Sequence, residues 1–471
     1  MSQTKRLSQL NAAESWLNSY RDLVNADFKA YDFESLREAL LDHIQVNYGE
    51  DFNDFINSSE YVALVDLISF LGQNIAFRAD LNLRETFLET AEVRENVLSI
   101  ARQIGYKSHR NKTAEGFLRI NSISSSQEIY DSRGVNLAGQ NIVWADPLNS
   151  DFQEQFNLIL NEAFNKSNPI GRPISTFQSG AMTREIYEFE ETDDSSLIEN
   201  VSLNSRAGQS YTFDIIPVTL EDGALIESPP SPLNAKSLTF NNDGTGFAGE
   251  SNGWFFSCKQ GTLQFQDIII DNVVENRVID INANNINDTD VWVQTVDQTG
   301  TILTYWTKVE STLGNNISFN DIDKEDRNIF EIITRTNDQI SIKFGNGSFG
   351  NVPFGNIRIW FRVSANEDFI IQKGETTDVD LNLVYVDSLG QPQEIVCNIS
   401  PKNNMAGIES ESITDIKNNA SRTAASQNRM ITADDYNNYP QGKVSGISRI
   451  KSINRIHTGQ SLYSDLADPT A

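Results

Sequence analysis

The chain is poor in several residue types, and each shortage excludes a class of protein. Its 471 residues include two cysteines, Cys258 and Cys397. Neither has metal-ligand spacing. Two thiols do not make a disulfide framework, so we expect a reducing compartment. The three histidines, His43, His109 and His457, stand in separate segments and lack the spacings of a metal or acid–base site.

Positive charge is also scarce. Against 65 Asp and Glu there are 37 Lys and Arg, which gives a formal net charge of -28. Such a chain repels phosphate backbones and anionic lipid surfaces, so we expect neither nucleic acid nor a membrane as a partner. The polar first 20 residues lack the apolar core of a secretory signal, which predicts synthesis and folding in the cytoplasm.

Familiar catalytic motifs are absent. The sequence holds neither a G-x-S-x-G elbow nor a Walker loop. Gly345, Gly347 and Gly350 spell G-x-G-x-x-G, but a second strand pattern follows where a dinucleotide site needs a helix. We interpret these glycines as a structural turn between two antiparallel strands, and we expect no enzymatic activity and no cofactor.

Acidic runs at 184–200 and 319–326 lack the glycine and oxygen spacing of an EF-hand, so we interpret them as solvated loops and expect no metal site. Charges of alternating sign between residues 78 and 102 accompany an apolar seam. Ion pairs that set helix register explain them better than paired catalytic carboxylates do.

What the chain does have is an unusually apolar helix within residues 61–105. Large apolar side chains cover most of its circumference, and only Asp66, Ser69, Gln73 and Asp80 form a polar stripe. No run of about 18 uncharged apolar residues exists, so we do not expect it to span a membrane. A helix that is apolar on most sides needs several neighbours. We predict an assembly interface at Val62, Val65, Ile68, Leu71, Ile75, Phe77, Arg78, Asp80, Arg84 and Phe87.

The flanking patterns predict an α+β, multidomain chain. Residues 1–110 form a helical bundle arm, in which Thr86 and Glu89 have the form of a capping box and Gly105 ends the last helix. Residues 111–400 form a β-rich body, possibly divided at about 235, with one helix near 152–164. Residues 401–471 form a small α+β segment, with a helix from Ser412 and a strand over 444–453.

Four segments carry a resemblance. The pattern D-L…L-G-Q-x-x-A-F-R-x-D-x-N-x-R-E-x-F-L-x-T-A over residues 66–91 resembles the gene product six family of baseplate wedge proteins of T-even-like phages. That family lies within the J-like baseplate proteins of contractile tails. Residues 340–364, with the turn F-G-x-G-x-F-G, and residues 406–439 are similar to J-like regions, and residues 251–264 also look like the wedge protein.

The resemblance implies a structural subunit of a phage tail baseplate, present in the virion and assembled in the host cytoplasm. In that family two copies share each wedge. Their N-terminal helices bundle with an elongated wedge subunit, next to a small lysozyme-like wedge subunit, and the β-rich part meets other baseplate proteins. The wedge couples baseplate rearrangement to sheath contraction. The family also has a further C-terminal domain that pairs subunits into a ring, and no residues of this sequence correspond to it.

Two other classes stay open at this stage. A receptor-binding or fibre-attachment tail protein is also acidic and β-rich, but typically shows repeats or heptads. A tail-associated hydrolase needs a carboxylate pair in a cleft, which sequence alone does not reveal.

Overall fold

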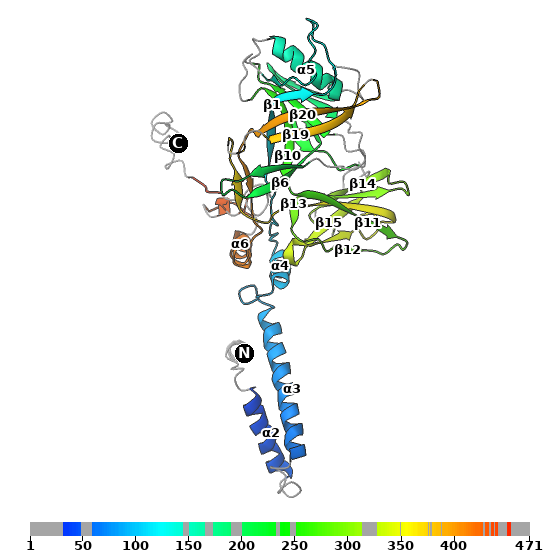
Figure 1. Ribbon diagram of the computed structural model, residues 1–471. Coiled ribbons are helices and arrows are strands. Elements are labelled where there is room, and N and C mark those ends of the chain that lie inside the picture. The colour runs from blue at the N-terminus through cyan, green and yellow to red at the C-terminus, as the bar shows by residue number, and fades with distance from the viewer. Residues whose placement is uncertain are drawn as a thin grey trace, which may run out of the picture. The chain divides into compact units, whose positions relative to one another are not determined.

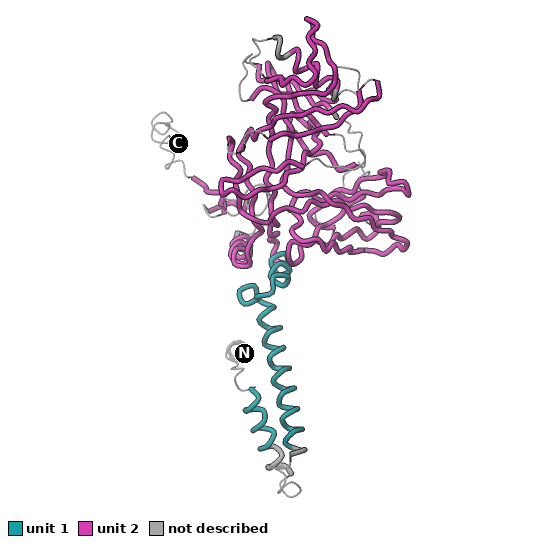
Figure 2. Tube along the Cα trace, in the orientation of Figure 1, with its two compact units in different colours: residues 1–103 teal, residues 104–471 magenta. Residues whose placement is uncertain are grey.

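The computed structural model describes residues 32–48, 59–144, 150–164, 173–189, 200–231, 236–244, 251–312 and 327–453, the last range with gaps at 349, 375, 377–378, 388, 427–428, 433–434, 438 and 441–449. The chain divides into two compact units, Met1–Gln103 and Ile104–Ala471 (Figure 2). The described fold is α+β, with helices in the first unit and a β-rich second unit, as the sequence predicts.

The first unit contains three described helices: α2 (Phe33–Tyr48), α3 (Ser59–Arg84) and α4 (Arg94–Gln103). Helices α2 and α3 lie side by side as a hairpin (Figure 1). Gly105 has φ +86°, the left-handed conformation of a residue that follows a helix, so the predicted stop is confirmed.

The predicted capping box at Thr86 and Glu89 is wrong. The Thr86 hydroxyl donates to the carbonyl of Leu83, at the end of α3. The N-terminus of α4 lies eight residues later, where the Glu85 carboxylate accepts the backbone N–H groups of Glu92 and Val93. A carboxylate from the preceding turn thus supplies the capping group, a partner that local spacing does not reveal.

A ten-stranded sheet forms one layer of the second unit. Its main path runs β19-β20-β1-β10-β9-β4-β3, with β2 beside β1, β6 beside β10 and β5 beside β6. Its strands are β1 (Glu115–Ser125), β2 (Ile142–Val143), β3 (Ser175–Ser179), β4 (Met182–Phe189), β5 (Asn200–Asn204), β6 (Ser210–Ile215), β9 (Lys236–Asn242), β10 (Gly253–Gln260), β19 (Val379–Val386) and β20 (Pro392–Pro401).

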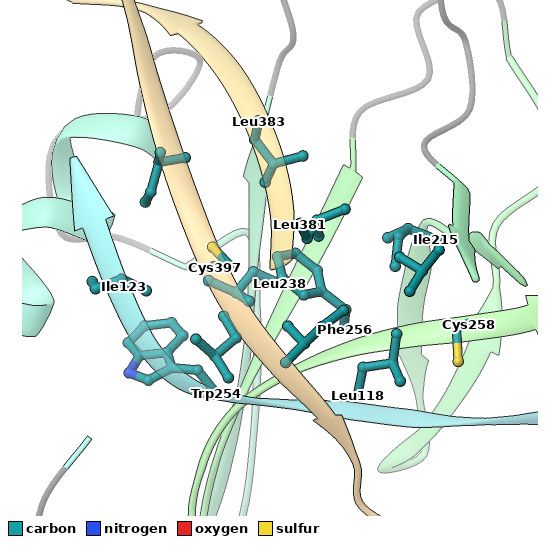
Figure 3. Close-up of a cluster of buried hydrophobic side chains, with 14 of the residues drawn as sticks. Leu118, Ile123, Ile215, Leu238, Trp254, Phe256, Cys258, Leu381, Leu383 and Cys397 are labelled. Atoms are coloured by element: carbon teal, nitrogen blue, oxygen red, sulfur yellow. The ribbon is translucent and has the colours of Figure 1, made fainter. Parts of the chain in front are cut away.

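The core of this sheet joins strands from both ends of the unit. Leu118 of β1, Phe256 of β10 and Leu381 of β19 gather in one cluster with both cysteines (Figure 3). The predicted helix near 152–164 is α5 (Ser150–Phe164), whose Phe156, at 0% exposure, packs into the same core.

A seven-stranded sheet, in the order β11-β17-β13-β14-β15-β16-β12, has a separate core. All its neighbours are antiparallel except β14 and β15. The strands are β11 (Thr262–Ile270), β12 (Val278–Ile281), β13 (Ile286–Val296), β14 (Ile302–Val309), β15 (Ile329–Thr334), β16 (Ile340–Phe344) and β17 (Gly355–Val363).

The second sheet is inserted into the first. The chain leaves the ten-stranded sheet after β10 and returns to it for β19 and β20, so the structural division lies at about 261 and 363 rather than at 235. The outgoing and returning segments touch at Gly261, where a Cβ would lie 2.3 Å from the carbonyl oxygen of Val363. Gly261 also has φ +112°, so glycine is required there for two reasons.

The remaining elements are small. Two further strand pairs are β7 (Val218–Glu221) with β8 (Ala224–Glu227), and β18 (Phe369–Ile371) with β21 (Met405–Gly407). Helix α6 (Ile413–Ser426) confirms the predicted helix and buries Ile416 and Ala420. Residues 450–453 are not in a strand, and the rest of the strand predicted over 444–453 lies outside the described residues.

Candidate functional site

The side of α3 that meets α2 carries small side chains. Val65 and Ser69 are buried, and the Ser69 hydroxyl donates to the carbonyl of Val65. A Cβ on Gly72 would lie 3.1 Å from Leu36, so glycine lets the two helices approach closely. Asp66 pairs with Arg37 of α2 at 2.7 Å, although both side chains are more than a third exposed, so this pair contributes at most about 1 kcal/mol.

The large apolar side chains of α3 point away from α2. At about 100° per residue, one seam is formed by residues 64, 68, 71 and 75, which alternate at spacings of four and three. A second seam, about 110° further around the axis, follows residues 67, 70, 74, 77 and 81. The first seam, Leu64, Ile68, Leu71 and Ile75, is 51–68% exposed; the apolar members of the second, Leu67, Phe70, Phe77 and Leu81, are 47–65% exposed.

The predicted interface residues therefore separate into three groups. Val62 and Val65 lie on the α2 side, and Val65 is buried inside the hairpin. Arg84 pairs with Asp80 at 3.0 Å within α3 itself. The remaining members are exposed: Ile68, Leu71, Ile75, Phe77, Arg78 and Phe87.

By length and composition alone, Val62–Arg84 also qualifies as a segment that is apolar enough to cross a membrane. Asp66, Arg78 and Asp80 interrupt this segment, and the expectation that it does not span a membrane stays a prediction.

A cluster of buried charges lies where the two sheets of the second unit meet. Arg362, at 1% exposure, bonds three carboxylates through its three nitrogens: Asp214 at 2.5 Å, Glu227 at 2.8 Å and Asp290 at 3.1 Å. Lys259 bonds two of them, Glu227 at 2.7 Å and Asp290 at 3.0 Å. We call these five residues the junction cluster. They come from β6, β8, β10, β13 and β17, so the cluster ties both sheets and the β7–β8 hairpin together.

The junction cluster holds three carboxylates against two cations. Burial raises the pKa of Asp214 to about 6, which its contact with Arg362 only partly offsets. One of its carboxylate oxygens, Oδ1, is buried without a hydrogen-bond partner, which further disfavours the charged form. Burial together with Asp290 also raises the pKa of Glu227. For Asp290 burial acts upward, but Lys259 and Arg362 outweigh it and the pKa is lowered.

Sequence reasoning missed the junction cluster because its members are far apart in the chain. The available signal was the presence of single charges inside strongly apolar strands, Lys259 in W-F-F-S-C-K-Q and Arg362 in I-R-I-W-F-R-V. Such a residue is either buried with partners or faces solvent, and the sequence does not identify the partners.

The glycine turn is built by close backbone approach. A Cβ on Gly345 would lie 2.5 Å from the carbonyl carbon of Gly350, and a Cβ on Gly350 would lie 2.7 Å from Ile329. Gly347 has φ +80° and donates its N–H to the carbonyl of Gly350. Strand β17 follows, as expected, and it runs antiparallel to β16 in the same sheet, although the two strands are not neighbours there.

Other predicted features fall in scattered places. His109 lies 3.8 Å from Glu411, which also accepts hydrogen bonds from Tyr106 and Asn419 and thereby ties residues 106–109 to the start of α6. The side chain of His43, and His457, lie outside the described residues, as do most of the first acidic run and all of the second. Within the described part of the chain, no three His, Cys, Asp or Glu side chains are grouped as metal ligands would be.

Comparison with protein families gives a match over most of the second unit. A family model described as a domain of unknown function, DUF8360, matches residues 116–404, which include both sheets. A search of curated proteins finds no match to the chain.

Proposed function

Because the chain belongs to the DUF8360 family, whose description names no activity, we propose a function from the chain's own surfaces and from its resemblance to baseplate wedge proteins. We propose that it is a structural subunit of a phage tail baseplate wedge, whose α2–α3 hairpin joins a helical bundle with other subunits. The observation that carries this proposal is the pair of exposed apolar seams on α3.

Two seams favour two kinds of neighbour. Each seam has the four–three spacing that packs knobs into holes on a facing helix, and α2 covers neither seam. One seam suits the same helix in a second copy of the chain. The other suits a helix of the elongated wedge subunit, near the small lysozyme-like subunit. Asn74, at a seam position of the second surface, is the kind of polar residue that fixes the register of a bundle at some cost in stability.

The energy available at these seams is large. A fully buried Leu, Ile or Phe side chain contributes roughly 1.5–3 kcal/mol. The eight apolar seam side chains are about half exposed, so covering them supplies on the order of 1 kcal/mol each. That total favours covering the seams with a neighbouring helix, and it leaves the uncovered hairpin prone to self-association.

In this proposal the body is a multidomain framework that transmits motion. The arm, the two sheets and the segment after 401 act as connected parts. The junction cluster holds the sheets together while other baseplate proteins pull on them. The protein has no enzymatic activity and works in the virion after assembly in the host cytoplasm.

The test is a charge placed on one seam. We expect Leu71→Asp or Ile75→Asp to prevent co-purification with partner subunits, because a carboxylate cannot be solvated inside a helix bundle. Gln73→Asp is the matched control, since it adds the same charge to an exposed position outside both seams. Circular dichroism should show the β-rich body unchanged in all three variants. Normal partner binding by the seam variants would overturn the proposal.

The composition of Val62–Arg84 favours one other location for this helix, a lipid bilayer. Flotation of the full chain with neutral vesicles separates the two. If the wild-type chain floats with the vesicles, and the Ile75→Asp variant does not float but still binds its partner subunits, the helix binds a membrane and not the wedge.

The hydrolase alternative predicts lysis of host cell walls in a turbidity assay.

A further inference from the structure

Strand β11 is the last strand at one edge of the seven-stranded sheet. It pairs with β17 over all nine of its residues, without a bulge. The backbone N–H of Leu263 donates to Asp214 instead of to β17. Since backbone groups alternate along a strand, the N–H and C=O groups of residues 265, 267 and 269 also point away from β17. Within the described ranges, no further strand pairs with them.

This edge lacks the usual protection against pairing. Exposed edge strands are normally interrupted by proline, lysine or a bulge. Between Thr262 and Ile270 there is neither a lysine nor a proline, and the only charge is that of Asp267. That charge is balanced, because Arg358 bonds both its oxygens at 2.7 Å and stacks on Phe265. Phe265 and Ile269, on the same side of the strand, are 45% and 69% exposed.

We propose that a second copy of this chain adds its own β11 to this edge, antiparallel and about a twofold axis, with Asp267 opposite the same residue of the other copy. This register is the one in which the outward backbone groups of residues 265, 267 and 269 all find partners. It also places Phe265 of each copy against Ile269 of the other, a favourable aromatic–aliphatic pair. The two Asp267 carboxylates face each other across the axis, and each is neutralised by Arg358 of its own chain on the neighbouring strand β17, which limits their repulsion. The symmetry makes the contact self-complementary and closed.

The strength of this contact follows from its size and from the charge of the whole chain. A ladder of a few residues buries less than the roughly 1,200 Å² of a stable interface, so the pairing is weak in dilute solution and effective at the high local concentration of an assembly. Each copy carries a net charge of -28, and Asp271 adds an acidic group at the end of the strand. Salt should therefore strengthen the pairing by screening this repulsion.

A cysteine at position 267 tests the register directly. Opposed residues of a hydrogen-bonded antiparallel pair have Cα atoms about 5.5 Å apart, within disulfide range. We expect Asp267→Cys in the full chain to form a disulfide-linked dimer on mild oxidation, and faster as salt is added. The double variant Phe265→Cys/Ile269→Cys should do the same. The native Cys258 and Cys397 are buried, so they contribute little background.

Matched variants decide between edge pairing and random collision. Leu389→Cys, at an 84% exposed position on another hairpin, should cross-link at least tenfold more slowly. Adding Ile269→Lys should abolish the cross-link at position 267, whereas Leu303→Lys, 61% exposed on a strand away from the edge, should not. Adding Ile75→Asp should leave it intact, because this contact is independent of the proposed arm interface. Equal cross-linking rates for Asp267→Cys and Leu389→Cys, or a cross-link at 267 that survives Ile269→Lys, would overturn the proposal.

Discussion

At the scale of single residues, one turn design recurs in the body. In each of four loops, the first residue donates its N–H to the carbonyl of the residue four later, and a glycine three later donates back to the first residue's carbonyl. The four loops begin at Asp131, Ser205, Asp297 and Asp387. The glycines, Gly134, Gly208, Gly300 and Gly390, all have φ between +78° and +86°. The sequence D-x-x-G-x therefore predicts such a loop wherever it separates two strand patterns.

Asp387 shows how the carboxylate of the first residue stabilises such a loop. Its Oδ1 accepts the N–H groups of Leu389 and Gln391, and its Oδ2 accepts the side chain of Gln393. Because Asp387 is only 7% exposed, removing its carboxylate leaves several hydrogen-bond donors without an acceptor. We expect Asp387→Ala to lower the free energy of unfolding in urea by about 1–3 kcal/mol. Asp387→Asn should recover part of this loss, and Asp297→Ala, in a more exposed loop, should cost less. Equal losses for the two alanine variants would contradict this account.

The glycine turn gives a second prediction at this scale. Gly345 has no room for a Cβ, which would lie 2.5 Å from the backbone of Gly350, whereas Gly347 has space and needs glycine only for its positive φ. We expect Gly347→Ala to cost about 1 kcal/mol. Gly345→Ala should cost more, about 1–3 kcal/mol, and should lower solubility, because the backbone has to move. Thermal unfolding of both purified variants gives the comparison. A Gly345→Ala protein as stable as wild type would show that the turn repacks freely.

At the scale of elements, the sequence predicts local structure well and pairing poorly. The helix near 152–164 and the stop at Gly105 depend on neighbouring residues, and both match the structure. The start of α4 depends on Glu85, which lies nine residues before Arg94 and has no fixed spacing. The polar stripe of α3 marks roughly the side that α2 covers, while the apolar remainder is exposed. The sequence therefore located the candidate surface but did not distinguish the buried Val65 from the exposed Ile68.

The junction cluster predicts a distinctive pH dependence at this scale. The pKa of Asp214 is about 6 in the folded state, above its value of about 3.9 when unfolded. Between these values the folded state binds more protons, so the contribution of Asp214 to stability is greatest below about pH 4 and falls as pH rises to about 6. The loss of stability amounts to about 3 kcal/mol once the pH is above the folded-state pKa, since one pKa unit corresponds to 1.36 kcal/mol.

Asp214→Asn isolates this contribution. The amide oxygen still accepts from Arg362 and from the N–H of Leu263, but it does not titrate. Urea unfolding of both proteins at pH 4, 5, 6 and 7 should show wild type losing stability relative to the variant as pH rises, with no further change above pH 7. A difference that is constant with pH, or that changes in the opposite direction, would show that Asp214 is charged throughout.

At the scale of the whole molecule, the insertion of one sheet into the other determines what can be separated. Strands β1 and β20 lie side by side although nearly 300 residues separate them, and the second sheet is made of residues between them. No pattern in the sequence states that the chain returns to its first sheet. The possible division predicted at about 235 assumed two consecutive parts, whereas the chain leaves and rejoins the first sheet where Gly261 and Val363 touch. Similarly, the boundary predicted at 110 lies beyond the one at Gln103.

The difference between the two N-terminal boundaries can be measured with fragments. Residues 104–111 look like the end of the arm in sequence, but they are anchored in the body. Tyr106 donates to Glu411, and the buried Arg110 guanidinium donates to the carbonyls of Ile286 and Asn287 on β13. We expect a fragment of residues 104–471 to unfold cooperatively. A fragment of residues 112–471 leaves these acceptors without donors, and should be less stable by several kcal/mol, at about 1–3 kcal/mol for each group left without a partner.

The complementary fragment 1–103 keeps both seams of α3 exposed, so it should bind a hydrophobic dye and form oligomers or aggregates. Equal unfolding midpoints for the two body fragments would place the boundary at 110 after all. A monomeric, dye-free fragment 1–103 with sharp unfolding would show that the arm satisfies its own apolar surface.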